Sequence, residues 1–273
     1  MKIVTFTHKQ RTRIGLIEGD YVHVTNMDDT MQYMIRRGMT PTRMGERYPL
    51  TEVTLNAPVE PGKIIAIGKN YAEHAKETGS NVPTAPIIFA KFPSSIIATG
   101  QAITWSKGIT KEVDWEGELA VVIGKRARNV SEEDAFKHVF GYTIANDVSA
   151  RDLQLRTDAQ WTRGKSLDTF CPLGPWIVTK DEIADPHALG IKTEISGNLR
   201  QDGNTKDFIF NIPTLIAYCS RMFTLEPGDL ILTGTPAGVG EGMSPKTYLQ
   251  DGDTVSITIE GIGTLTNSCV VTE

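Results

Sequence analysis

The chain has 273 residues, of which 40% are hydrophobic and 22% are charged, and its formal net charge is −5. This is the composition of an ordinary globular protein, so it excludes a disordered chain, a collagen and a coiled coil. The acidic balance, with no block of like charges, also argues against partners such as nucleic acids or anionic membranes.

The N-terminus and the cysteines indicate the compartment. The first residues lack the apolar core of a secretory signal, and no window of about 18 uncharged apolar residues appears. Cys171, Cys219 and Cys269 are odd in number and widely spaced, which argues against a disulfide framework or a structural zinc site. We therefore expect a soluble, cytoplasmic protein whose cysteines are buried free thiols.

Residues 1–58 are predicted to form a small β-rich domain of their own. Three stretches there alternate apolar and polar side chains with the period of a β-strand, which predicts a β-meander. These stretches are 2–7, 13–19 and 21–25. A short helix is expected over 31–37, with Asp28 or Asp29 as its cap and Gly38 at its end. Several prolines then interrupt the pattern before the boundary.

Residues 59–273 are predicted to form one larger domain, in which strands dominate. The expected strands are 63–68, 86–92, 115–124, 142–147, 173–179, 191–196, 230–234 and 254–259. Three helices are expected. The first begins near Asn70, the second spans 131–139 with Ser131 and Asp134 as a capping pair, and the third spans about 213–223. Without regular alternation of strands and helices, this sequence predicts a mainly β (α+β) fold, a mixed β-roll or sandwich, rather than a doubly wound nucleotide fold.

Acidic side chains stand at the ends of two apolar strands. Glu116 and Glu118 are two residues apart on a strand, so they point to the same face. The apolar run after them belongs in the interior, where two like charges are costly unless a cation neutralises them. A solvated edge strand is the alternative for two glutamates alone, but Asp147 ends a second apolar strand. Three converging carboxylates favour a hard cation, so we predict a Mg²⁺ or Mn²⁺ site in which Ca²⁺ could substitute.

A candidate base precedes these strands. His74 and Glu77 are three residues apart in a polar helical segment, so they face the same way. The carboxylate could orient the imidazole and raise its basicity while the ring takes a proton from water. A solvated histidine on a surface helix is the alternative. Further on, Lys165 lies among aromatic residues and prolines and could donate to an anion, although it and Arg151 also fit surface or structural roles.

Five segments together resemble the signatures of the fumarylacetoacetate hydrolase family, and they occur in that family's order. The resemblance covers about residues 58–272, and its segments are 68–79, 114–124, 142–154, 161–175 and 232–240. The matches include Asp-Trp-Glu-Gly-Glu-Leu-Ala from Asp114 and Thr-Gly-Thr-Pro-Ala-Gly-Val-Gly from Thr233. On these residues the chain is identified as a member of the family.

The resemblance implies a mixed β-roll for the larger domain, a homodimer, a bound divalent metal and a small keto-acid substrate. The implied metal ligands are Glu116, Glu118 and Asp147. The implied catalytic residues are His74, Glu77 and Lys165, of which the first two lie on a lid segment. The implied substrate-binding residues are Tyr71, Arg151, Gln154 and Thr235.

The main functional expectation from this resemblance is a divalent-metal-dependent hydrolase or decarboxylase. It would cleave a carbon–carbon bond in a small 2,4-dioxo or β-keto dicarboxylic acid of aromatic catabolism. In the hydrolase, His74 oriented by Glu77 would activate water while Lys165 and Gln154 stabilise the oxyanion. The alternative is a 2-hydroxyhepta-2,4-diene-1,7-dioate isomerase or keto–enol tautomerase, which needs only proton shuttling. A non-catalytic metal-binding scaffold is a remote alternative, which the presence of His74 and Glu77 argues against.

Overall fold

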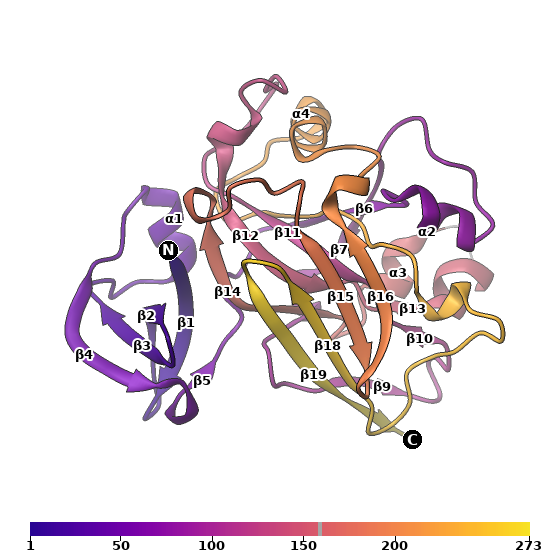
Figure 1. Cartoon of the computed structure of the whole chain (residues 1–273), viewed down its shortest axis with the longest axis horizontal. Coiled ribbons are helices and arrows are strands. Elements are labelled where there is room, and N and C mark those ends of the chain that lie inside the picture. The colour runs from indigo at the N-terminus through magenta and orange to yellow at the C-terminus, as the bar shows by residue number, and fades with distance from the viewer. Residues whose placement is uncertain (158–159) are drawn as a thin grey trace.

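Strands provide most of the regular structure of the protein (Figure 1). The computed structural model describes residues 1–157 and 160–273. The N-terminal strands are β1 (Lys2–His8), β2 (Arg11–Glu18), β3 (Tyr21–Thr25), β4 (Arg43–Pro49) and β5 (Thr54–Leu55). The strands up to the middle of the chain are β6 (Ile64–Gly68), β7 (Ile87–Lys91), β8 (Ile96–Ile97), β9 (Ile103–Ser106), β10 (Val113–Asp114), β11 (Gly117–Ile123), β12 (Val139–Asn146) and β13 (Ser149–Ala150). The remaining strands are β14 (Cys171–Thr179), β15 (Gly190–Ile195), β16 (Asn198–Asn204), β17 (Leu230–Leu232), β18 (Thr254–Ile259) and β19 (Gly263–Thr272). The α-helices are α1 (Met31–Arg37), α2 (Ala72–Glu77), α3 (Trp161–Lys165) and α4 (Ile212–Met222).

The larger sheet has 12 strands, and its path runs β4-β3-β2-β1-β14-β12-β11-β17-β6-β7. Neighbours on this path are antiparallel except for β17 and β6, which are parallel. Every residue of β11 is buried, and so is nearly all of β12. Because both faces of these central strands are covered, their sequences are continuous apolar runs instead of alternating patterns.

A second sheet of five strands, in the order β16-β15-β18-β19-β9, covers one face of the larger sheet (Figure 1). β15 contacts β11 and β19 contacts β14. Side chains from both sheets meet in one apolar core, where Trp115, Ile144, Ile191 and Ile257 are at most 1% exposed. Two sheets packed around a shared core are the rolled, mainly β fold that the sequence predicts, and that prediction is confirmed.

The N-terminal strands form the predicted meander and also extend the larger sheet. β1 to β4 pair with one another in the order of the sequence. β1 pairs in addition with β14, where Lys2 faces Val178 and Ile3 faces Ile177. A second apolar core accompanies this junction, because Met34 of α1 packs in the same cluster as Ile64 and Leu230. The N-terminal part and the larger sheet therefore share a buried interior.

Two local predictions are corrected by the structure. Helix α1 has the expected bounds and ends at Gly38, but its cap is Thr30, whose hydroxyl accepts the Tyr33 amide at 3.2 Å. Asp28 and Asp29 are wrong as caps because Thr30 is the residue directly before the first helical one.

The predicted α-helix over 131–139 is a shorter 3₁₀ turn at Ala135–His138. Ser131 does accept the Asp134 amide at 3.3 Å, as a capping residue would. The chain then enters β12 at Val139, which leaves no length for a full helix. Among the described residues, no helix is long and apolar enough to span a bilayer.

Candidate active site

The pairing of β11 with β12 brings three carboxylates together. Gly117 lies opposite Asn146 in this antiparallel pair, so Glu116 and Asp147 just outside it lie side by side. The Asp147 amide donates to the Glu116 carbonyl at 2.9 Å. Carboxylate oxygens of Glu116, Glu118 and Asp147 all lie within 4.8 Å of one another. The convergence that the strand pattern indicates is therefore present.

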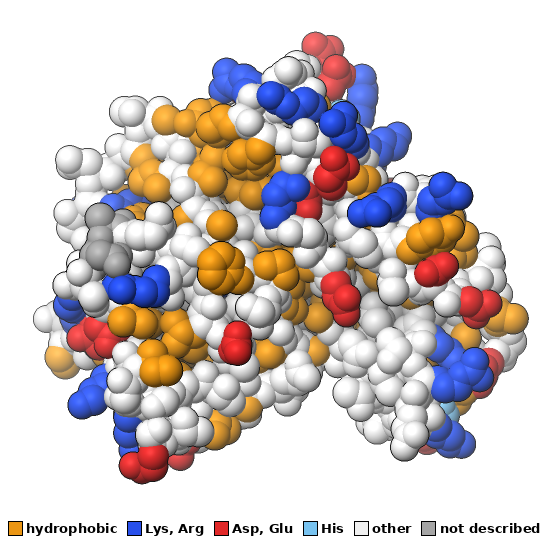
Figure 2. Space-filling view, turned by 180° about the vertical axis from the view of Figure 1, so that it is seen from behind, with side chains coloured by type: hydrophobic (Ala, Val, Ile, Leu, Met, Phe, Trp, Pro, Cys, Tyr) orange, Lys and Arg blue, Asp and Glu red, His pale blue; other side chains and the backbone are white. Residues whose placement is uncertain are grey.

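These carboxylates are buried, unlike the charged side chains of both signs that are spread over the surface in Figure 2. Glu118 and Asp147 are each 1% exposed. Gly117 lets the second sheet approach them closely, because a Cβ at this position would lie 2.4 Å from the Thr193 hydroxyl oxygen. A larger residue there would push β15 away from the site.

Two buried lysines neutralise part of this charge. Lys165, at the end of α3, places its ammonium 2.7 Å from Glu116 Oε2 and 2.8 Å from Asp147 Oδ2. Lys91, at the end of β7, lies 2.7 Å from Asp147 Oδ1. The sequence analysis missed Lys91, which is 1% exposed. A lysine that ends the apolar run from Ile87 was the available signal.

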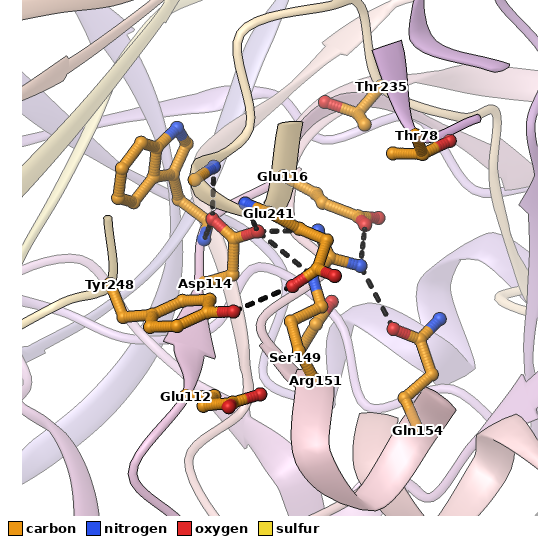
Figure 3. A network of polar contacts seen from close by, with 12 residues as sticks. Thr78, Glu112, Asp114, Glu116, Ser149, Arg151, Gln154, Thr235, Glu241 and Tyr248 are labelled. Atoms are coloured by element: carbon orange, nitrogen blue, oxygen red, sulfur yellow. Dashed lines mark hydrogen bonds and ion pairs between the residues drawn. The ribbon is translucent and has the colours of Figure 1, made fainter. Parts of the chain in front are cut away.

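Arg151 links the carboxylate cluster to a second buried acid (Figure 3). Its guanidinium lies 2.8 Å from Asp114 Oδ2 and 2.8 Å from Glu116 Oε1, and it donates to Gln154 Oε1 at 2.9 Å. Asp114 also accepts the Gly240 amide at 2.7 Å, which fixes the glycine-rich loop beside the site. Asp114 belongs to one of the family-like motifs, but the sequence alone predicted no role for it. Its position between Val113 and Trp115 marks it as a buried charge.

The protonation equilibria of the cluster reflect these contacts. Burial alone would raise the pKa of Glu116, but Lys165 and Arg151 outweigh burial and lower this pKa to about 2. The pKa of Glu118 is raised well above its ordinary value by burial and by the negative charges of Asp147 and Glu116. Glu118 is thus the member of the cluster whose charge is least compensated.

The donor set fits a hard divalent cation. Four buried carboxylates face three buried basic side chains, so negative charge is in excess. The acids are Asp114, Glu116, Glu118 and Asp147, and the bases are Lys91, Arg151 and Lys165. In the described part of the chain Glu118 makes no ion pair, and its Oε2 accepts the Gly234 amide at 2.7 Å. An all-oxygen set with one uncompensated carboxylate is what Mg²⁺ or Mn²⁺ prefers.

The predicted base is ordered by its neighbouring acid. His74 Nδ1 donates to Glu77 Oε1 at 2.9 Å, and Glu77 Oε2 accepts the Gly238 amide at 2.9 Å. His74 is 6% exposed and lines the cavity in front of the carboxylates. With Nδ1 occupied by Glu77, Nε2 of the neutral ring is left as the proton acceptor.

The site surrounds a small cavity of about 90 Å³. The predicted site residues that line it are His74, Glu116, Glu118, Arg151, Gln154, Lys165 and Thr235. Glu77 and Asp147 stand behind His74 and Lys165 and contact them. Tyr71 is outside this lining, because its ring is 2% exposed and packs 5.1 Å from the ring of Phe208.

The Thr235 hydroxyl donates to the Gly117 carbonyl at 2.9 Å and accepts from the Gln201 amide group at 2.7 Å. Larger cavities of about 260 and 800 Å³ lie elsewhere, and their linings contain none of the predicted site residues. The acid–base and charged groups therefore converge on the smaller cavity. Its volume of about 90 Å³ suits a small ligand.

The fold and this site define an enzyme of the fumarylacetoacetate hydrolase family, to which the chain belongs: residues 63–270 match the family described as Fumarylacetoacetate (FAA) hydrolase C-terminal. Residues 1–58 match a second family described as Rv2993c-like, N-terminal. The chain is 51% identical to oxaloacetate tautomerase YisK of Bacillus subtilis over 224 residues, which cover 81% of this chain and 74% of the relative.

Solved structures show the same relationship over the whole length. Fumarylacetoacetate hydrolase from Exiguobacterium antarcticum is 42% identical, with a TM-score of 0.89 and full coverage of both chains. The 2-hydroxyhepta-2,4-diene-1,7-dioate isomerase from Mycobacterium marinum is 39% identical, with a TM-score of 0.85 and coverage of 99% and 98%. The family prediction made from the sequence motifs is confirmed.

Proposed function

We propose that the protein is a keto–enol tautomerase of a small dicarboxylic keto acid, with oxaloacetate as the substrate to test first. The observation that carries this proposal is that His74 lines the cavity and that, among the described residues, its ring makes a hydrogen bond through Nδ1 to Glu77 and none through Nε2. The other basic groups of the cluster are held by carboxylates, since Lys165 pairs with Glu116 and Arg151 pairs with Asp114. A tautomerisation requires only that one proton move between a carbon and an oxygen of the same molecule.

His74 would perform that transfer alone. Its Nε2 would take a proton from the carbon next to the keto group and return it to the enolate oxygen, and the reverse sequence would convert enol to ketone. Glu77 would hold the ring in the tautomer with Nδ1 protonated and would stabilise the imidazolium while the proton is on Nε2. Protons and charges balance without water, oxidant or a second substrate.

The charged residues would bind and polarise the substrate. Glu116, Glu118 and Asp147 would hold a divalent cation, which as a Lewis acid stabilises negative charge on a carbonyl oxygen. Lys165 and the Gln154 side-chain amide line the same cavity and would donate to substrate oxygens. Their charge and dipoles favour the enolate over the neutral ketone, which makes the adjacent carbon more acidic.

The relatives favour this function over the hydrolase and decarboxylase, which were the main expectation from the sequence. The relatives include an oxaloacetate tautomerase and a dienedioate isomerase. The isomerase is the second candidate because it needs the same single base, but its seven-carbon substrate is larger.

The test uses oxaloacetate supplied as its enol to protein loaded with Mg²⁺ or Mn²⁺. We expect the ultraviolet absorbance of the enol to decay faster with the protein than without it. Pyruvate, measured through a coupled dehydrogenase, should form no faster than in the protein-free control. Pyruvate release that keeps pace with enol loss would identify a decarboxylase and contradict the proposal. An unchanged enol decay, with turnover of the dienedioate, would instead favour the isomerase.

A further inference from the structure

One basic side chain of the cavity wall is not committed to a carboxylate. The cavity is lined by three strongly basic residues, Lys69, Arg151 and Lys165. Arg151 and Lys165 are buried in ion pairs at 2.7 to 2.8 Å. Within residues 1–157 and 160–273, Lys69 has no ion pair, and it is only half-buried. Its ammonium is therefore available to an anion that enters the cavity.

The backbone holds Lys69 firmly at this position. Its φ is +58°, in the left-handed region, between the buried residues Gly68 and Asn70. The Asn70 side chain donates to the Thr233 carbonyl at 2.8 Å and accepts the Phe210 amide at 2.8 Å. A non-glycine residue adopts this conformation at some energetic cost, so these bonds must maintain it. The backbone from which the Lys69 side chain extends is thus fixed beside the cavity.

An aromatic wall directs the side chain of Lys69. Its ammonium lies 5.6 Å from the ring centroid of Trp161, and that ring stands 5.4 Å from the ring of Phe89. Trp161 fits closely over Gly68, where a Cβ would lie 2.4 Å from the ring. On the other end of this wall, Lys165 lies 5.2 Å from the Phe89 ring centroid. The two lysines therefore flank one aromatic pair.

We propose that Lys69 binds the second carboxylate of a dicarboxylic keto acid and makes the enzyme selective for dianionic substrates. The inference rests on the proposed function, in which the keto-acid end of the substrate lies beside Lys165 and the carboxylate cluster. The far end of such a molecule needs a cation that no protein acid already occupies, and Lys69 meets that condition. Glu241 on the cavity wall does not compete for Lys69, because it pairs with Arg156 and Lys246.

The test compares a diacid with a matched monoanion. Lys69→Met removes the charge but keeps a long unbranched side chain, so the energetic cost of the left-handed backbone at this position is similar. Lys69→Arg keeps the charge. Lys76→Met is the control, because it removes an exposed lysine from the same segment. The substrates are oxaloacetate and its 4-methyl ester. We expect Lys69→Met to lower kcat/KM for oxaloacetate about 10- to 100-fold, mainly through KM, and to leave the ester within about twofold.

Lys69→Arg should retain most of the activity on the diacid, and Lys76→Met should resemble the wild type. An equal loss on both substrates would mean that Lys69 supports the site as a whole, and no loss on either would mean that it does not contact substrate. Either result overturns the proposal.

A binding measurement separates this proposal from the tautomerase assignment. Malate and its 4-methyl ester cannot tautomerise, so calorimetry with Mn²⁺-loaded protein reports recognition alone. If the wild type binds malate more tightly than the ester, and Lys69→Met abolishes that difference, the carboxylate contact is supported even if oxaloacetate is not turned over. Equal affinities for malate and its ester in the wild type would exclude that contact even if the tautomerase activity is found.

Discussion

At the scale of single residues, His74 and Glu118 make separable contributions to the site. His74 forms a hydrogen bond with Glu77. Within the described residues, it makes no hydrogen bond or ion pair with the clustered carboxylates Glu116, Glu118 and Asp147. Glu118 contributes one of the three clustered carboxylates and, among the described residues, makes no ion pair. Proton transfer and cation binding should therefore respond to different substitutions.

Replacing His74 tests proton transfer. We expect His74→Ala to lower kcat for enol–keto exchange by about 10² to 10⁴, because the transferring base is lost. Affinity for Mn²⁺ should be unchanged. Glu77→Gln should give a smaller loss, because the imidazole remains but loses its orienting anion. Stopped-flow decay of the enol measures kcat, and full activity in His74→Ala would show that another group moves the proton.

Replacing Glu118 tests cation binding. Glu118→Gln removes a buried acid whose ionisation is opposed by burial and by Asp147 and Glu116, so in chelator the variant should have a higher free energy of unfolding than the wild type. Adding Mn²⁺ at 100 times its dissociation constant should stabilise the wild type by about 2.7 kcal/mol and the variant by much less. Denaturant titrations with and without Mn²⁺ measure both effects.

The exposed Glu133 gives a matched control, since Glu133→Gln removes the same charge from the surface. Its response to Mn²⁺ should equal that of the wild type. Wild-type Mn²⁺ affinity in Glu118→Gln would refute the assignment of this residue as a ligand.

The site residues differ in how far the sequence could predict them. Glu116, Glu118 and Asp147 follow from strand periodicity and apolar flanks, which are local properties. Lys91 and Asp114 do not, because their importance lies in ion pairs with partners 56 and 37 positions away in the chain. A buried lysine is recognisable in a sequence only as an exception to the apolar pattern, and its partner requires the fold.

At the scale of elements, edge position explains why β4 and β16 were not predicted from the sequence. β4 and β16 end the paths of the two sheets, and their residues are largely exposed and polar. An edge strand need not present an apolar face, so periodicity does not detect it. The central strands β11, β12 and β14 carry long apolar runs and were expected close to their observed bounds.

Helix α4 yields a prediction about pH. The Ile212 amide at its first turn donates to His187 Nε2 at 3.2 Å, so the helix end requires a neutral imidazole. Burial lowers the pKa of His187 from its ordinary value of 6.5, with Asp185 opposing that effect. Near and below pH 6.5, His187 then binds more protons in the unfolded chain than in the folded one. The folded state should therefore lose stability as the pH falls through that range.

We expect His187→Gln, which keeps an acceptor but cannot ionise near this pH, to lose less stability than the wild type between pH 7 and about pH 5.5. Urea titrations at both pH values measure the difference. An identical pH dependence in the two proteins would show that His187 remains neutral throughout or that its protonation does not affect α4.

At the scale of the whole molecule, the apolar core beside β1 and β14 couples the N-terminal part to the rest. All four tryptophans, Trp105, Trp115, Trp161 and Trp176, lie beyond the predicted boundary at residue 58. Met34 is fully buried in the shared core. Met34→Ala should therefore lower the free energy of unfolding by about 2 to 5 kcal/mol. Tryptophan fluorescence during denaturant unfolding measures this change. An unchanged tryptophan transition would mean that residues 1–58 unfold independently.

The carboxylate cluster and the His74–Glu77 pair come from different segments of the chain, and this separation bears on how new reactions arise. The three carboxylates lie at one end of the β11–β12 strand pair, whereas His74 and Glu77, the proposed proton-transfer pair, lie on α2, a short helix about 40 residues earlier in the chain. Substitutions on and around that helix can alter which atom receives a proton, or admit a water, while the carboxylate cluster keeps its geometry. One inherited scaffold can thus acquire different reactions, as the tautomerase, isomerase and hydrolase names of the similar proteins illustrate.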